Sequence, residues 1–161
     1  MKQYSLPFPV KQHITQAHRQ GQKIVLVTGV FDVLHEEHFN FLQKAKQEGE
    51  VLLVAVETDE RVRVLKGPTR PIYPEQDRVV NLQKLGIADA VFLLPENFSN
   101  KQDHRDFIRL IKPNILAVSS HSPFIKQKQQ LLQEVGGEVH IVHQHNPEIS
   151  STKLIKEQGL S

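Results

Sequence analysis

The chain has 161 residues and a formal net charge of +2, and its 39% hydrophobic and 24% charged residues are typical of one globular domain. It contains no cysteine, which excludes disulfides, thiolate zinc sites, iron–sulfur clusters and cysteine nucleophiles. The small net charge does not favour nucleic acid as a partner. The longest apolar run, residues 51–56, is too short to span a bilayer, and no signal peptide is seen. We therefore expect a cytoplasmic protein that binds neither nucleic acid nor membrane.

Five short apolar runs, rich in β-branched residues, predict five strands. In chain order they cover residues 24–28, 51–56, 90–94, 115–118 and 139–142. The first two runs are apolar at nearly every position, which is typical of parallel strands that helices cover on both faces.

Helical patterns alternate with these runs. The predicted helices cover residues 10–20, 38–46, 75–85, 104–111, 124–135 and 150–158. Apolar residues recur three and four apart within them, as in Phe41, Leu42 and Ala45. Such alternation predicts an α/β fold: a single Rossmann-like, doubly wound, parallel five-stranded sheet with helices on both faces. We expect one domain over residues 1–161, with its core in about 20–157 and a leading helix at 10–20.

A polar motif follows the first predicted strand, where the two usual glycine-rich phosphate loops are absent from the sequence. In open parallel sheets the ligand crevice lies at the carboxyl ends of the strands, so Gly29, Asp32, His35 and His38 are expected there. Two histidines three apart at a helix start can face one crevice, and the helix N-terminus attracts anions. The alternatives are two solvated surface histidines and a metal pair, for which no matched third ligand is present.

Three segments resemble one enzyme superfamily. Residues 29–38 are similar to the G-x-F-D-x-x-H-x-G-H signature of nucleotidyltransferases related to class I tRNA synthetases. Residues 65–72, with Glu75, Asp77 and Arg78, resemble the L-K-G-P-x-R-P-I…E-x-D-R stretch of heptose-1-phosphate adenylyltransferases. Residues 149–155 are similar to the C-terminal S-T-T/S-x-I motif. The resemblance spans about residues 20–157 and extends to glycerol-3-phosphate cytidylyltransferases.

The resemblance implies that a substrate phosphate attacks the α-phosphate of a nucleoside triphosphate and that pyrophosphate leaves. His35, His38 and Lys66, the last in a loop after the second strand, would be catalytic and would stabilise charge on the phosphates. The nucleotide-binding residues would be Gly29, Val30, Phe31, Asp32, Arg70, Ser150, Ser151 and Thr152. Magnesium would accompany the triphosphate, held by phosphate oxygens and water and by no protein metal site. Related enzymes are commonly homodimers.

Several of these residues also have structural interpretations. Phe31 either packs in the core or forms a wall against the nucleotide. Asp32 either braces a turn through backbone amides or touches the ligand. Asp77 and Arg78, one turn into a helix, are expected to form surface or interhelical ion pairs. Ser150 and Ser151 cap the last predicted helix in either case.

Two positions depart from the resemblance. The family's glycine between the two histidines is Glu37 here, which brings bulk and negative charge to a site for polyanions. An inward Glu37 side chain would weaken triphosphate binding, whereas an outward one would change little. The heptose-type enzymes of the resemblance carry a K-G-x-D-like stretch after the fourth strand, where this chain has residues 119–122, Ser-Ser-His-Ser. The identity of the acceptor substrate therefore stays open. His140, His143 and His145 are expected to form a solvated edge.

Three classes of function follow. The first is a nucleotidyltransferase, with ATP and a sugar phosphate preferred and CTP with an alditol phosphate next. The second is a nucleotide-binding module that has lost turnover through Glu37. The third is a metal-dependent hydrolase whose metal is bound by His35 and His38. This class is disfavoured because the spacing of the two histidines is one residue shorter than in the H-E-x-x-H motif. We adopt the first as the working hypothesis.

Overall fold

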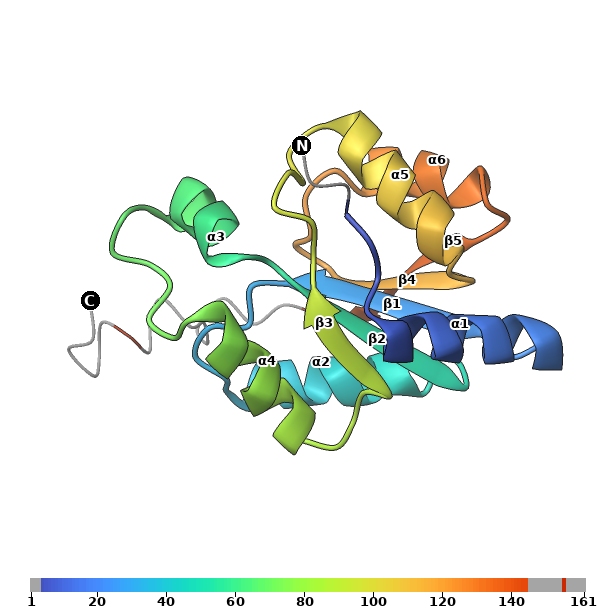
Figure 1. Cartoon of the computed structure of the whole chain (residues 1–161), viewed down its shortest axis with the longest axis horizontal. Coiled ribbons are helices and arrows are strands. Elements are labelled where there is room, and N and C mark those ends of the chain that lie inside the picture. Colours follow the sequence, from blue (N-terminus) through green and yellow to red (C-terminus); the bar gives the residue numbers. More distant parts are fainter. Residues whose placement is uncertain (1–3, 145–154, 156–161) are drawn as a thin grey trace.

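A five-stranded parallel sheet forms the centre of the computed structural model, which describes residues 4–144 and residue 155 (Figure 1). The strands are β1 (Ile24–Gly29), β2 (Val51–Val56), β3 (Ala90–Leu93), β4 (Ile115–Ser119) and β5 (Glu138–His143), in the order β3-β2-β1-β4-β5. β1 pairs with β2 along its whole length, from Ile24 opposite Val51 to Gly29 opposite Val56. The predicted fold class is confirmed.

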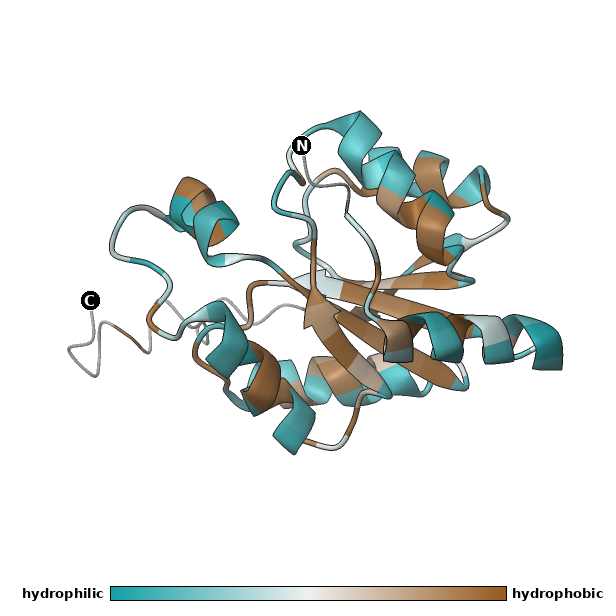
Figure 2. Cartoon of the chain, in the orientation of Figure 1, coloured by the Kyte–Doolittle hydropathy of each residue, from teal (hydrophilic) through white to brown (hydrophobic). Residues whose placement is uncertain are grey.

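Helices cover both faces of this sheet. On one face lie α1 (Phe8–Gln20), α5 (Lys101–Ile111) and α6 (Ile125–Gln133), and on the other lie α2 (Glu36–Lys46) and α4 (Glu75–Lys84). Alternate side chains of β1 pack on opposite faces of the sheet. Ile24 and Leu26 belong to one core cluster, and Val25 and Val27 belong to the other. Figure 2 shows the strands as mostly hydrophobic, as expected for a sheet without a solvated face.

One helix, α3 (Asp59–Lys66), stands apart from both layers beyond the carboxyl ends of the strands (Figure 1). The Oγ1 atom of Thr58 caps it by accepting from the N–H group of Arg61 at 3.4 Å. Val62 is its only buried residue. Its other apolar residues, Val64 and Leu65, are exposed. Lys66 is the last residue of this helix, so the prediction that it lies in a loop is wrong.

The other helices agree with the prediction apart from their ends. α5 begins three residues before the predicted start because Asn100 and Asp103 form a capping box. The predicted helix at 150–158 lies outside the described residues except for Ile155, which is buried.

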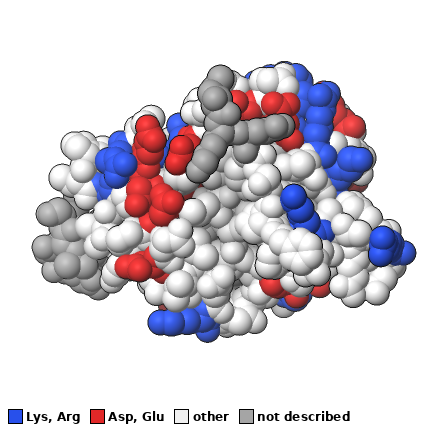
Figure 3. Space-filling model, viewed as in Figure 1, with Lys and Arg blue, Asp and Glu red and all other residues white. Residues whose placement is uncertain are grey.

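The surface in Figure 3 carries basic and acidic side chains interspersed over the same face. In the described part of the chain, no helix has the length and apolar character needed to cross a membrane.

Candidate active site

A pocket of about 410 Å³ opens at the carboxyl ends of β1 and β4. The loop from β1 to α2, the end of α3, the loop after β4 and the end of β5 all contribute to its lining. Every predicted site residue that the structure describes lines it: Gly29, Val30, Phe31, Asp32, His35, His38, Lys66 and Arg70. Ser150, Ser151 and Thr152 lie outside the described residues.

The two histidines of the motif are held by backbone N–H groups at the start of α2. The Nδ1 atom of His35 accepts from the N–H group of Glu37 at 3.2 Å, and Nδ1 of His38 accepts from the N–H group of His35 at 3.3 Å. The two rings are stacked with their centroids 4.0 Å apart. Because each Nδ1 atom accepts, each neutral ring carries its proton on Nε2 and can donate it to a ligand.

Burial keeps these imidazoles neutral. It lowers the pKa of His38 from 6.5 to about 3, with a further contribution from the neighbouring His35. Burial also lowers the pKa of His35, although Glu37 opposes this effect. At neutral pH the pair therefore offers two hydrogen-bond donors rather than two cations.

A loss of stability in acid follows from this shift. The unfolded chain takes up a proton on His38 below its ordinary pKa of 6.5, whereas the folded chain resists protonation down to about 3. The stabilisation is therefore complete above pH 6.5 and is lost as pH falls toward 3. We expect the free energy of unfolding to drop as the pH falls below about 6.5, and to drop less in His38→Asn. Urea denaturation of both proteins measures this, and equal drops would contradict it.

Phe31 packs in the core and also lines the pocket, so the two interpretations of this residue do not exclude each other. Its side chain is buried in the core cluster on the α2 side of the sheet. Its ring would lie 2.8 Å from a Cβ atom added at Gly29 and lies 5.5 Å from the His38 ring, centroid to centroid. A side chain at position 29 would therefore have to displace the Phe31 ring.

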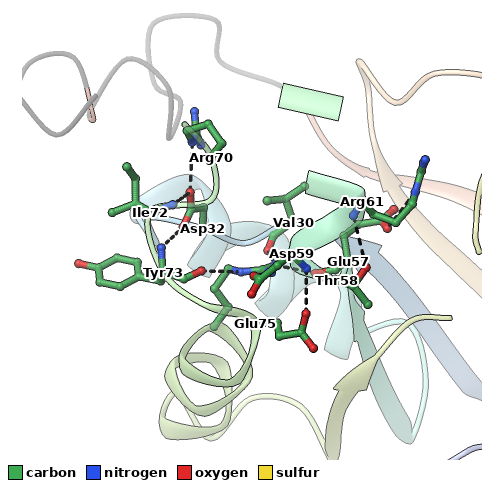
Figure 4. Close-up of polar contacts among 11 residues, drawn as sticks. Val30, Asp32, Glu57, Thr58, Asp59, Arg61, Arg70, Ile72, Tyr73 and Glu75 are labelled. Carbon is green, nitrogen blue, oxygen red and sulfur yellow. Dashed lines mark hydrogen bonds and ion pairs between the residues drawn. The ribbon is translucent and has the colours of Figure 1, made fainter. Parts of the chain in front are cut away.

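Asp32 braces a distant segment rather than its own turn (Figure 4). The residue is 2% exposed, and its carboxylate accepts from the N–H groups of Ile72 at 2.8 Å and Tyr73 at 2.9 Å. It also accepts from Nε of Arg70 at 3.2 Å. Asp32 therefore holds the cation of Arg70 at the rim of the pocket.

Among the residues that the structure describes, Arg78 is the largest fully buried side chain, with 0% exposure. Its guanidinium donates to the carbonyl oxygens of Tyr73 at 3.0 Å, Val30 at 2.9 Å and Glu57 at 2.7 Å, and to Oδ1 of Asp59 at 2.8 Å. Of the two predicted alternatives for Arg78, the interhelical ion pair is confirmed, because Arg78 on α4 pairs with Asp59 on α3, and the surface ion pair is wrong, because Arg78 is buried. The planar fork of donors instead joins the segments after β1 and β2 to the start of α4.

A second pocket, of about 440 Å³, adjoins the first on the side of α5 and α6. Both pockets are lined by Thr28, Glu57, Leu65, Pro123 and Lys128. Its basic side chains include Arg61, His104 and Lys128, and its apolar wall includes Phe98 and Phe107. Sequence reasoning missed this pocket because its residues come from separate elements without a shared motif.

One side-chain atom of Glu57 and one of Arg61, where the two pockets meet, are buried without a hydrogen-bond partner among the described residues. These atoms, Oε2 of Glu57 and Nε of Arg61, are 3.7 Å apart. Burial raises the pKa of Glu57, while Arg61 and Arg78 oppose the rise. Such atoms are suited to contact a polar ligand.

A family model described as cytidylyltransferase-like matches residues 26–157. The chain belongs to this family. The superfamily predicted from the motif at 29–38 is therefore confirmed.

Curated relatives of this cytidylyltransferase-like chain include proteins named bifunctional protein HldE. That of Desulfatibacillum aliphaticivorans is 35% identical over 149 residues, which are 92% of this chain and 29% of the relative. That of Methylobacillus flagellatus is 40% identical over 101 residues, which are 63% of this chain and 20% of the relative. The chain thus spans less than a third of the length of these relatives.

Solved structures share the cytidylyltransferase-like fold. A lipopolysaccharide core biosynthesis protein from Thermoplasma volcanium matches with a TM-score of 0.62 and 28% identity, over 78% of this chain and 98% of that one. A pantoate-beta-alanine ligase from Francisella tularensis matches with a TM-score of 0.60 over 93% of this chain and 75% of that one. Its 16% identity makes it evidence for the fold alone.

Glu37, which stands where the signature that residues 29–38 resemble has a glycine, turns toward β5. Its Oε2 atom contacts Nε2 of His143, and both side chains are largely buried, with 19% and 10% exposure. Glu37 and His143 both line the first pocket. The expectation that His143 belongs to a solvated edge is wrong, because the carboxylate of Glu37 gives it a partner 106 residues away.

Proposed function

We propose that the chain transfers a nucleoside monophosphate from a nucleoside triphosphate to a phosphorylated sugar. AMP, taken from ATP, is the preferred nucleoside monophosphate. A phosphate oxygen of the acceptor attacks the α-phosphorus, the bond to the bridging oxygen breaks, and that oxygen leaves on pyrophosphate. The observation that carries this proposal is the convergence of His35, His38, Lys66 and Arg70 on one pocket. The family match and the HldE and lipopolysaccharide core relatives support a sugar phosphate as the acceptor.

The chain supplies position and charge rather than a nucleophile. The Nε2–H groups of His35 and His38, together with the N-terminus of α2, are placed to donate to the α- and β-phosphates. Lys66 ends α3 and is exposed, so its ammonium can follow the phosphates. Arg70 is fixed by Asp32 and supplies a second cation. Ser150, Ser151 and Thr152 remain predicted contacts of the β- and γ-phosphates.

The chemistry of the donor set fits a magnesium ion that arrives with the triphosphate. Among the described residues, no three or more His, Asp or Glu side chains are grouped to hold a metal. The pocket carboxylate of Asp32 is already occupied by Arg70 and two amides. Bound magnesium would neutralise phosphate charge, and phosphate oxygens with water would complete its octahedral shell.

The second pocket is the proposed site of the acceptor. It meets the first at Glu57 and Lys128, so a phosphate bound there would lie next to the triphosphate. Arg61 and Lys128 supply positive charge for that phosphate, and the free polar atoms of Glu57 and Arg61 suit sugar hydroxyls.

Pyrophosphate release with ATP, CTP, GTP and UTP, each paired with sugar phosphates and alditol phosphates, tests this function. We expect release with ATP and a sugar phosphate, and a higher KM for that acceptor in Arg61→Met with little change in the KM for ATP. Triphosphate binding without release on any pair would instead favour a binding module that has lost turnover.

We also propose one catalytic domain, working in the cytoplasm where nucleoside triphosphates are made. A homodimer remains a prediction from the resemblance.

A further inference from the structure

Among the described residues, three carboxylates line the first pocket, and they differ in position and in hydrogen-bond partners. Asp32 is occupied by Arg70 and two backbone amides. Glu57 lies at the end of β2, on the side of the second pocket. Glu37 lies on the side of β5, and its Oε1 atom has no hydrogen-bond partner in the part of the chain that is described.

His143 holds Glu37 in place and is itself positioned by Lys44 and Phe41. The Nζ atom of Lys44 lies 3.2 Å from Nδ1 of His143, and an ammonium group can only donate, so Nδ1 accepts. The neutral imidazole then carries its proton on Nε2 and donates it to Oε2 of Glu37. Phe41 packs edge-on against His143, with centroids 6.4 Å apart. Glu37 is therefore a fixed acceptor with one free oxygen at the pocket wall.

Glu37 and His38 point in different directions although they are neighbours in the chain. Successive residues on a helix do not share a face, and the His38 ring packs toward Phe31 while the Glu37 carboxylate reaches His143. A carboxylate repels phosphate, so the triphosphate belongs with His38 and the cations. The aromatic end of the pocket, beside Phe41 and His143, is left for the base.

We propose that Glu37 reads the base of the nucleotide by accepting a hydrogen bond from an exocyclic amine. Adenine and cytosine present such an amine, whereas guanine and uracil present a carbonyl oxygen at the equivalent position, which a carboxylate repels. Glu37 is then a specificity-determining residue that selects ATP or CTP over GTP and UTP. This inference rests on the proposed function, because it assumes that the pocket binds a nucleoside triphosphate.

Calorimetric titration with ATP and with inosine triphosphate tests the inference most directly, because inosine carries a carbonyl where adenosine carries its 6-amino group. The wild-type chain is expected to bind ATP about 10- to 100-fold more tightly than inosine triphosphate. In Glu37→Gln the amide can donate to that carbonyl, so the preference should fall to near unity or invert. Glu36→Gln is the matched control, since Glu36 is exposed on the same turn of α2. It should keep the wild-type preference.

Equal binding of ATP and inosine triphosphate by the wild-type chain would overturn base reading and leave nucleotidyl transfer intact. This comparison needs no variant, so it holds even if Glu37→Gln does not fold. A uniform change in both affinities in Glu37→Gln would also overturn the inference, because it would mean a general effect of charge. Absence of binding by any triphosphate would overturn the proposed function together with the inference.

Discussion

Replacing His38 by alanine is expected to lower kcat by about 100- to 1,000-fold, the usual loss when one preorganised donor to a transition-state charge is removed. His38 is held by the N–H group of His35 and by contact with Phe31, so its Nε2–H group needs no reorganisation when charge develops. The KM for ATP should change much less, because Lys66, Arg70 and the start of α2 still face the triphosphate. Steady-state pyrophosphate release measures both constants.

The matched control for this variant is His18→Ala, on the exposed side of α1 and away from the pocket. Its kinetics should equal those of the wild-type chain. His38→Gln, whose amide reaches toward the position of Nε2, should recover part of the lost rate. Unchanged turnover in a folded His38→Ala protein, checked by circular dichroism, would refute the proposed mechanism.

Replacing Arg78 by methionine is expected to destabilise the fold by about 3–5 kcal/mol, as is usual when one partner of a buried ion pair is removed. The change leaves three carbonyl oxygens without their donor and separates Asp59 from its cation. For a chain of this size the melting temperature should fall by roughly 6–20 °C. Thermal denaturation measures the shift.

Arg63→Met is the control for Arg78→Met, because Arg63 is exposed on α3 and its loss should move the melting temperature little. Equal effects of the two substitutions would show that burial of Arg78 contributes nothing beyond the loss of one charge. Arg78→Met should also raise the KM for both substrates, because Arg78 bonds to residues after β1 and β2 that line the two pockets.

The sequence by itself determined the sheet, the layers and the place of the site. The runs at 24–28 and 51–56 are apolar at nearly every position, which only a strand covered on both faces tolerates. The signature at 29–38 is local, because His35, Glu37 and His38 form one helix start whose hydrogen bonds join residues two or three apart. Periodicity and capping are short-range properties, so a single chain segment reveals them.

Only the tertiary structure decided what these residues touch. Asp32 finds its partners about 40 residues later, Arg78 reaches back 48 residues to Val30, and Glu37 meets His143 across 106. The second pocket likewise gathers side chains from α3, α5 and α6. Such contacts follow from strand order and helix packing, which bring distant segments together at the carboxyl edge of the sheet. A charged residue therefore has the same local pattern whether it ends at the surface or, like Arg78, in the core.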